Sequence, residues 1–281
     1  MVQSAEQPAK SKMSYHKGPI TVVYCREPSA SMPRLEIFYD VISPYSYLAW
    51  HSLKRYAPRW GVAVQPRPFF LGGVMMGAKN APPGMNPAKG AWLATDLPRQ
   101  AAMAGLPLLP TPANFLSEVA RQSITLQRVI VAAGPRADDA TAPGDPALAG
   151  ALTEAFASAL HADPQFRDGT NLLPIDTDFV CRACAAHAPL GPLLEGGDAA
   201  VHALLEEAAS VEVKGALKAT TEEALARGCF GAPVMFLHGE GVALPQAAAA
   251  ASEGGAMVFG SDRFEQLAWM LGQKWDGPAP R

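Results

Sequence analysis

The stretch LEIFYDVISPYSYLAWHSLKRYAPRWGVAVQPRPFF, residues 35–70, decides the fold. Residues 35–42 are rich in aromatic and β-branched side chains and lie between prolines, which predicts a buried strand. Residues 46–60 carry apolar side chains at helical spacing and precede Gly61, so we expect a helix there. Residues 62–70 predict a second strand. A strand, a helix and a strand in this order indicate a right-handed parallel βαβ unit.

The middle of the chain, from residue 71 to about residue 204, has a different character. Glycine and proline punctuate residues 72–87, which we interpret as a loop. The residues that follow are rich in alanine and leucine at helical spacing and predict an all-helical insert. Residues 202–228 then predict one long helix. Two short apolar strands and a closing helix are expected at residues 233–238, 256–260 and 262–275.

A βαβ unit, a helical interruption and a final ββα unit predict an α/β fold, namely a thioredoxin-like domain interrupted by an all-helical insertion domain. We assign residues 34–75 and 205–281 to the thioredoxin-like domain and residues 76–204 to the insertion. Residues 1–33 are polar, lack the apolar segment of a signal peptide and contain acidic residues that argue against a transit peptide. We interpret them as a disordered or spurious N-terminal extension.

The composition narrows the functional classes. The 281 residues carry a net charge of −3 and no basic block, so nothing points to a nucleic acid or to an anionic membrane. The chain also lacks an apolar run of about 18 residues, so we expect no membrane insertion. Four cysteines are too few for a disulfide framework and indicate a reduced intracellular compartment. Cys181 and Cys184 have helical spacing and are interpreted as a packed pair, without a metal site.

The sequence SPYS at residues 43–46 carries serine where a redox enzyme would carry Cys-x-x-Cys. Ser43 falls where a strand ends and a helix begins, and free N–H groups at a helix start stabilise an anion. Because the protein supplies no sulfur here, the ligand must bring the anion, and the Ser43 hydroxyl can donate a hydrogen bond to it. The alternative is that Ser43 only caps the helix.

Three other stretches contain candidate binding residues, each with a structural alternative. Ala232 and Pro233 precede a strand; a cis bond there would let the Ala232 backbone pair with an extended peptide, and a trans proline would only start the strand. Ser261 and Asp262 could bind a carboxylate and an ammonium, or cap the closing helix. Asn80 could contact a peptide backbone, or serve only as a turn residue.

Five stretches in order resemble kappa-class glutathione transferases, which share the thioredoxin-like superfamily with bacterial disulfide oxidoreductases and 2-hydroxychromene-2-carboxylate isomerases. They are FYDVISPYSYLAW (38–50), NAPPGMNPAKGAWLATDL (80–97), VKGALKATTEEALARGCFGAPVMF (213–236), FGSDRFEQLAWMLGQKW (259–275) and DGPAP (276–280). Residues 134–150 and 239–255 depart from the family pattern.

The resemblance implies glutathione as cosubstrate, a small electrophile as second substrate and a homodimer. It implies that Ser43 is the catalytic serine that hydrogen-bonds the glutathione sulfur. The residues that match other glutathione-binding positions are Pro44, Tyr45, Asn80, Ala232, Pro233, Ser261 and Asp262. It also implies a role in detoxification, with glutathione peroxidase activity in addition, and a mitochondrial or peroxisomal location, while a cytoplasmic one stays open.

Three alternative functions remain open at this stage. A glutathione-dependent isomerase of the 2-hydroxychromene-2-carboxylate type would use the same serine. A disulfide oxidoreductase would need a thiol, and Cys229 is the one thiol close to the expected cleft. A non-catalytic thioredoxin-like module would bind without turnover.

Overall fold

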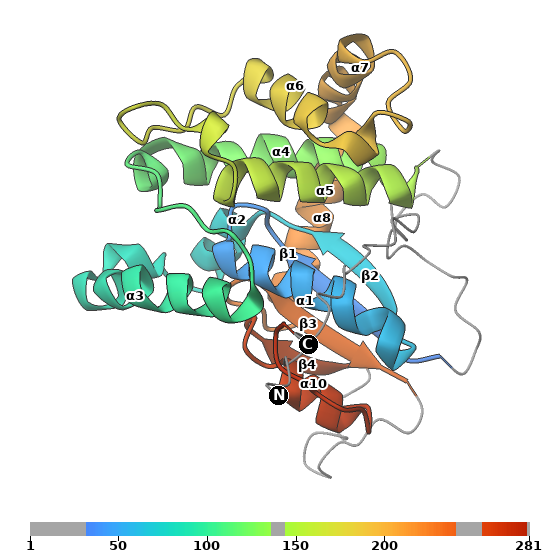
Figure 1. Ribbon diagram of the computed structural model, residues 1–281. Helices are drawn as coiled ribbons and strands as arrows, with labels where there is room; N and C mark the ends of the chain where they lie inside the picture. The colour runs from blue at the N-terminus through green and yellow to red at the C-terminus, as the bar shows by residue number, and fades with distance from the viewer. Residues whose placement is uncertain (1–31, 136–143, 240–254, 280–281) are drawn as a thin grey trace, which may run out of the picture.

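The computed structural model describes residues 32–135, 144–239 and 255–279. Its sheet has the strand order β2-β1-β3-β4, in which β1 and β2 are parallel, while β3 is antiparallel to β1 and to β4 (Figure 1). The strands are β1 (Arg34–Tyr39), β2 (Ala63–Pro68), β3 (Val234–His238) and β4 (Ala256–Phe259). This topology confirms the predicted βαβ unit, the interruption and the ββα unit.

Two helices, α1 (Pro44–Trp60) and α10 (Phe264–Met270), cover one face of the sheet. Leu35, Ile37 and Tyr39 alternate along β1 and pack into the main core on this side. α1 begins with Pro44, which has no N–H to lose, and ends at Gly61, whose positive φ of 63° suits a left-handed helix cap.

The opposite face of the sheet is covered by α2 (Leu71–Gly77) and α8 (Val211–Ala226). The interpretation of residues 72–87 as a loop is therefore wrong in part, since the segment holds α2 and the short 3-10 helix η1 (Pro83–Met85). Gly77 serves close packing here instead of a turn. A Cβ atom at this position would lie 2.5 Å from Leu225 Cδ1 on α8.

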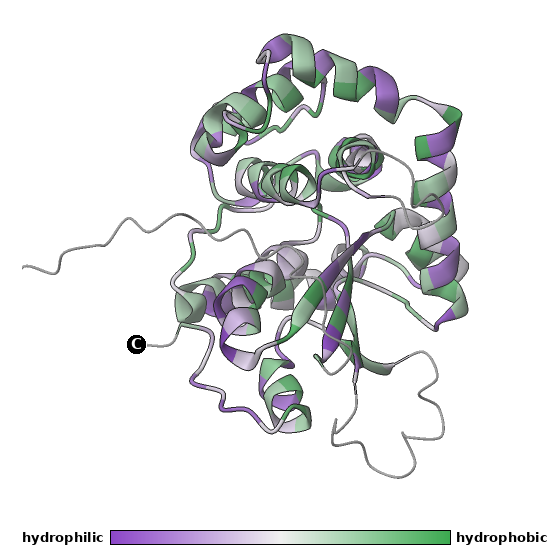
Figure 2. Cartoon of the chain, turned by 90° about the vertical axis from the view of Figure 1, so that its right-hand side faces the viewer, coloured by the Kyte–Doolittle hydropathy of each residue, from purple (hydrophilic) through white to green (hydrophobic). Residues whose placement is uncertain are grey.

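The predicted all-helical insert is present and packs over the end of the sheet at the top of Figure 1. α4 and α5 contribute to the same core as α1, whereas α3 extends to one side. Most helices carry both hydrophobic and hydrophilic residues in Figure 2, as expected of helices that bury one face. The insert comprises α3 (Pro87–Ala104), the π-helix η2 (Phe115–Val119), α4 (Ala120–Ala133), α5 (Pro146–His161), η3 (Pro164–Phe166), α6 (Thr177–Ala186), η4 (Ala188–Leu190) and α7 (Asp198–Ala208).

The prediction of one helix over residues 202–228 is wrong. α7 ends at Ala208, and Ser210 caps the start of α8 by accepting a hydrogen bond from Val213 N at 3.2 Å. The domain boundary predicted at residues 204–205 falls inside α7 and stays a prediction. The N-terminal extension and most of residues 134–150 and 239–255 lie outside the described residues.

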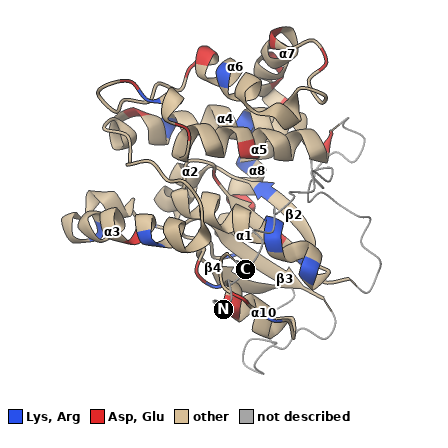
Figure 3. Ribbon diagram, in the orientation of Figure 1, with Lys and Arg blue, Asp and Glu red and all other residues tan. Residues whose placement is uncertain are grey.

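Two surface properties bear on partners. In the described part of the chain, no helix is both long enough and apolar enough to cross a membrane. Acidic and basic residues are interspersed along the ribbon in Figure 3.

Candidate functional site

One edge of the sheet gathers most of the predicted site residues. Val234 of β3 lies opposite Phe38 of β1 and opposite Phe259 of β4. Because both pairings are antiparallel, the residues that follow β1 and β4 meet those that precede β3. The edge therefore brings together Ser43 and Pro44, Ala232 and Pro233, and Ser261 and Asp262.

Ser43 is buried, with 5% of its surface exposed, at the start of the helix α1. Its Oγ accepts a hydrogen bond from Ser46 N at 3.2 Å and donates one to Ala232 O at 3.4 Å. Ser43 therefore does cap the helix, as one of the two alternatives predicted, and its O–H is engaged by the contact to Ala232 O. A bond of 3.4 Å is long, so a stronger acceptor can replace the Ala232 carbonyl.

The peptide bond between Ala232 and Pro233 is cis, one of the two alternatives that the sequence left open. The Ala232 carbonyl is already engaged, because it accepts the hydrogen bond from Ser43. Pro233 O accepts a hydrogen bond from Gly260 N at 3.0 Å, which ties this loop to the one that carries Ser261.

A chain of hydrogen bonds joins Tyr45 to Ser261 through two residues of α3 that the sequence reasoning missed. Tyr45 OH donates to Asp96 Oδ2 at 2.8 Å, and Gln100 Nε2 donates to the same oxygen at 2.8 Å. Ser261 Oγ donates to Gln100 Oε1 at 3.2 Å. Burial, then the bond to Asp96, then the charges of Asp96 and Asp262 raise the pKa of the Tyr45 hydroxyl. The signal available in the sequence was the spacing of four between Asp96 and Gln100, which places both residues on one face of a helix.

The expectation that Ser261 or Asp262 caps the closing helix is wrong. α10 begins at Phe264, its cap residue is Arg263, and no side chain bonds to its first N–H groups. Asp262 is exposed and pairs with Arg263 instead. Its carboxylate is therefore accessible to a cationic ligand group.

Asn80 lies beside the loop that contains Ala232. Its Nδ2 donates to Phe230 O at 2.8 Å, and its Oδ1 accepts from Ala81 N at 2.9 Å. The Phe230 ring contacts the Phe259 ring with centroids 4.4 Å apart. The structure thus places Asn80 at the same edge as the other predicted residues, as a loop residue whose amide holds the chain before the cis bond.

Comparisons with known proteins assign this architecture. The DSBA-like thioredoxin domain family matches residues 34–169. Glutathione S-transferase kappa 1 of Homo sapiens is 32% identical over 251 residues, which cover 89% of this chain and 96% of the human protein. This chain belongs to the kappa-class glutathione transferase family.

Two other known proteins are similar to this chain, one in sequence and one in fold. Glutathione S-transferase kappa 2 of Caenorhabditis elegans is 28% identical and covers 87% of this chain and 94% of its own. The solved structure of a 2-hydroxychromene-2-carboxylate isomerase is similar in fold, with a TM-score of 0.59 at 22% identity over 85% of this chain and 94% of that one.

Three cysteines lie in the described residues of this kappa-class chain, and none of them belongs to α1 or to its cap. Cys229 is buried in the small core under α2 and α8, and burial raises the pKa of its thiol to about 12. On α6, burial likewise raises the pKa of the Cys184 thiol to about 12. Cys184 lies in the main core, and Cys181 packs against that core. Both sites favour protonated thiols, which agrees with the interpretation of Cys181 and Cys184 as a packed pair. The described residues contain no group of three metal-ligating side chains.

A set of buried polar groups lies behind Ser43 and was also missed from the sequence. Asp40, Gln127 and His161 are buried, and all three bond to the chain between β1 and α1. Burial raises the pKa of the Asp40 carboxyl to about 6 although it accepts three hydrogen bonds. Residues 124–131 read ITLQRVIV, in which Gln127 is one of several polar residues, so the sequence held no signal for it.

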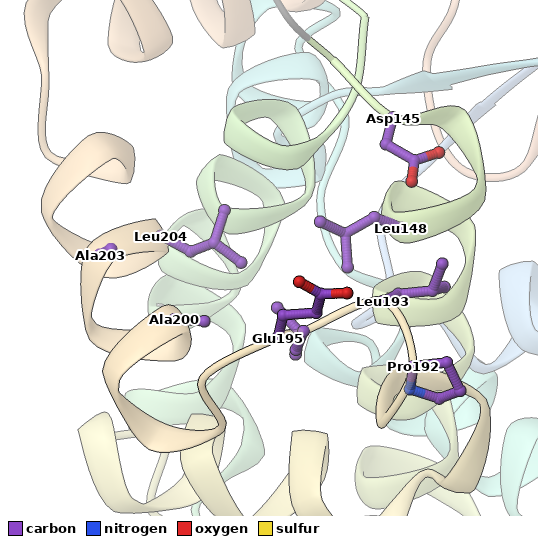
Figure 4. Close-up of a pocket in the computed structure, with 9 residues that line it drawn as sticks. Asp145, Leu148, Pro192, Leu193, Glu195, Ala200, Ala203 and Leu204 are labelled. Atoms are coloured by element: carbon purple, nitrogen blue, oxygen red, sulfur yellow. The ribbon is translucent and has the colours of Figure 1, made fainter.

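A hollow of about 560 Å³ lies in the kappa-class insert, away from this edge (Figure 4). Its walls are largely apolar, and Asp145, one of its two carboxylates, already caps α5 by accepting from Ala147 N. None of the predicted site residues lines it. Its lining residues are Asp145, Leu148, Pro192, Leu193, Leu194, Glu195, Ala200, Ala203 and Leu204.

Proposed function

We propose that this protein is a glutathione transferase in which the Ser43 hydroxyl donates a hydrogen bond to the sulfur of bound glutathione and favours its thiolate. One observation carries the proposal. Ser43 Oγ, at the N-terminus of α1, keeps a donor that is engaged only by the long contact to Ala232 O. Family membership supports the identity of the ligand.

The energetics of deprotonation are adequate at this site. A free thiol titrates near a pKa of about 8.5, and each unit of pKa corresponds to about 1.36 kcal/mol. A hydrogen bond to a charged group contributes roughly 1.5–3 kcal/mol. The N-terminus of a helix adds roughly 0.3–2 kcal/mol for an anion beside it. Together these contributions lower the thiol pKa by roughly one to four units, so much of the bound thiol is ionised at neutral pH.

The arrangement of the edge supports an extended pose for glutathione. Its cysteinyl part lies along Ala232, and its thiolate replaces the Ala232 carbonyl as the acceptor for Ser43. The γ-glutamyl carboxylate lies at Ser261 and its ammonium at Asp262, whose exposed carboxylate has room for a second cation. Asn80, Pro44, Tyr45 and Pro233 complete the walls, and Lys89 on the first turn of α3 is exposed to attract a carboxylate.

The chemistry is nucleophilic attack by a positioned thiolate. With an aryl halide, a carbon–sulfur bond forms, halide leaves, and the thiol proton passes to solvent. With an organic hydroperoxide, sulfur attacks the terminal oxygen, an alcohol leaves, and a second glutathione converts the sulfenic acid to glutathione disulfide and water. We place the electrophile between the edge of the sheet and the insert helices.

Product analysis distinguishes this function from its alternatives. Purified protein is incubated with glutathione and an aryl halide, and separately with glutathione and 2-hydroxychromene-2-carboxylate. We expect conjugation of the aryl halide. Isomerisation without conjugation would replace the proposal by the isomerase, which the same serine also serves. Absence of heat in a calorimetric titration with glutathione would reject both.

A homodimer and an organelle location are part of the same proposal. Several large apolar side chains are exposed in the monomer, in support of a partner surface: Met76, Met85, Trp92, Leu116, Phe230 and Phe259. Sedimentation velocity tests the dimer, and a monomer at micromolar concentration would reject it. Family membership is the basis for a mitochondrial or peroxisomal location, which imaging of the tagged full chain tests.

A further inference from the structure

The turn between β1 and α1 carries Ser43 and is held by side chains of the helical insert. Gln127 of α4 is fully buried, and its Oε1 accepts a hydrogen bond from Val41 N at 3.3 Å. Its Nε2 donates to Tyr39 O at 2.8 Å and to Phe69 O at 3.0 Å. Both amide hydrogens and the carbonyl oxygen are therefore used. One side chain thus joins the ends of β1 and β2 to the turn.

His161, the last residue of α5, binds the other backbone group of Val41, its carbonyl oxygen. Its Nε2 lies 2.8 Å from Val41 O. A carbonyl oxygen only accepts, so Nε2 carries the hydrogen and donates it. Burial lowers the pKa of His161 to about 4, which keeps the ring neutral in this role. Gln127 and His161 together bind both backbone hydrogen-bonding groups of Val41.

Asp40 and Ile42 lie on either side of Val41, and hydrogen bonds hold both of them. The Asp40 carboxylate accepts from Ile42 N at 3.1 Å through Oδ1, and from Ser123 Oγ of α4 at 3.1 Å through Oδ2. Asp40 O accepts from Ser43 N at 3.0 Å. Every residue of the turn is thereby fixed by a bond to a buried partner.

We propose that Ser123, Gln127 and His161 of the insert are positioning residues for Ser43. This inference rests on the proposed function of Ser43. Their hydrogen bonds to the turn go to Asp40 and Val41 and not to Ser43, so they act on Ser43 through residues 40–42. Misplacement of a reacting group by about 1 Å can lower a rate about 100-fold, so a turn that moves by a fraction of that distance is costly. The insert thus sets the position of the donor in the other domain.

The test uses two substitutions of His161 and, as a control, one substitution of Thr153, which is also on α5. His161→Phe keeps a ring and removes the donor to Val41 O, whereas His161→Gln keeps an N–H donor. Thr153→Val is the matched control, because Thr153 is also buried and bonds the Tyr39 hydroxyl at 2.8 Å without touching the turn. The measurements are the pKa of bound glutathione's thiol, kcat, the KM for glutathione and the melting temperature.

We expect His161→Phe to raise the bound thiol pKa by about one unit and to lower kcat about tenfold or more, with a smaller change in KM. His161→Gln should recover most of both quantities. Thr153→Val should lose stability and keep the wild-type thiol pKa and kcat. Wild-type values of both quantities in His161→Phe would overturn the inference. So would a Thr153→Val variant that loses as much as His161→Phe, because a general loss of stability would then explain both.

Ser123→Ala covers the case in which His161→Phe does not fold. It removes only the hydroxyl that donates a hydrogen bond to Asp40. Like His161→Phe, it should lower the acid dissociation constant of the bound thiol and kcat, each by about two- to fivefold, roughly the value of one weak hydrogen bond. An unchanged pKa and kcat in this variant would overturn the inference. A wild-type protein that leaves the glutathione pKa unchanged overturns the proposed function together with this inference. A lowered pKa in the wild type with no effect of the variants overturns this inference alone.

Discussion

Ser43→Ala removes two different interactions, and the structure allows them to be separated. The hydroxyl accepts from Ser46 N at 3.2 Å as the cap of α1, and it supplies the O–H that we assign to the glutathione sulfur. Loss of the cap should lower the free energy of unfolding by about 0.5–2 kcal/mol. Loss of a hydrogen bond to a thiolate, about 1.5–3 kcal/mol, should lower turnover about 10- to 100-fold.

The assay is steady-state conjugation of an aryl halide at neutral pH, with the KM for glutathione measured in the same series. We expect kcat to fall and KM to change much less, because most of the tripeptide binds elsewhere along the edge. Thermal or denaturant unfolding of the same preparation measures the change in the free energy of unfolding.

Ser210→Ala is the control for the cap. Ser210 caps α8 with the same geometry, accepting from Val213 N at 3.2 Å, and it does not belong to the site edge. It should lose comparable stability and retain full turnover. Wild-type turnover in Ser43→Ala would refute the role of its hydroxyl, and an equal loss of turnover in Ser210→Ala would show that stability alone is responsible.

Three further predictions concern buried groups. Burial raises the pKa of Asp40 from 3.8 to about 6, so its contribution to stability is full below 3.8 and is lost as the pH rises through about 6. The unfolding free energy of wild type relative to Asp40→Asn should therefore fall by about 3 kcal/mol across this range, and a flat difference would contradict the burial argument. Ser46→Ala should keep or raise the melting temperature, because Ser46 Oγ is buried without a hydrogen-bond partner among the described residues; a marked fall would reveal a partner. The wild-type protein should not reduce insulin disulfides, since the Cys229 thiol, with a pKa of about 12, stays protonated; turnover would support the oxidoreductase.

The parts of the fold that the sequence predicts well are those set by local pattern. The strand at residues 35–42 and the helix after Ser43 follow from alternation, helical spacing and proline, and they differ from β1 and α1 only at their ends. The meeting of residues 43, 232 and 261 also agrees with expectation, and the bond before Pro233 takes the cis form, one of the two alternatives left open. The meeting follows from the antiparallel pairing of β3 with β1 and with β4.

The parts that the sequence did not predict depend on contacts between distant residues. Residues 71–77 form a helix although their glycines resemble a loop signal, and Gly77 packs closely against Leu225 of α8, a contact that the sequence does not show. Ser261 bonds Gln100 instead of capping a helix, and His161 bonds Val41 across 120 positions. No spacing rule relates such pairs, so only the packed structure reveals them.

The deprotonation of glutathione on the wild-type protein tests the central claim most directly. Thiolate absorbance is followed against pH with glutathione bound and with glutathione alone. The hydrogen bond from Ser43 and the field of α1 predict a midpoint roughly one to four units below the free value of about 8.5. The same midpoint in both titrations would contradict the account.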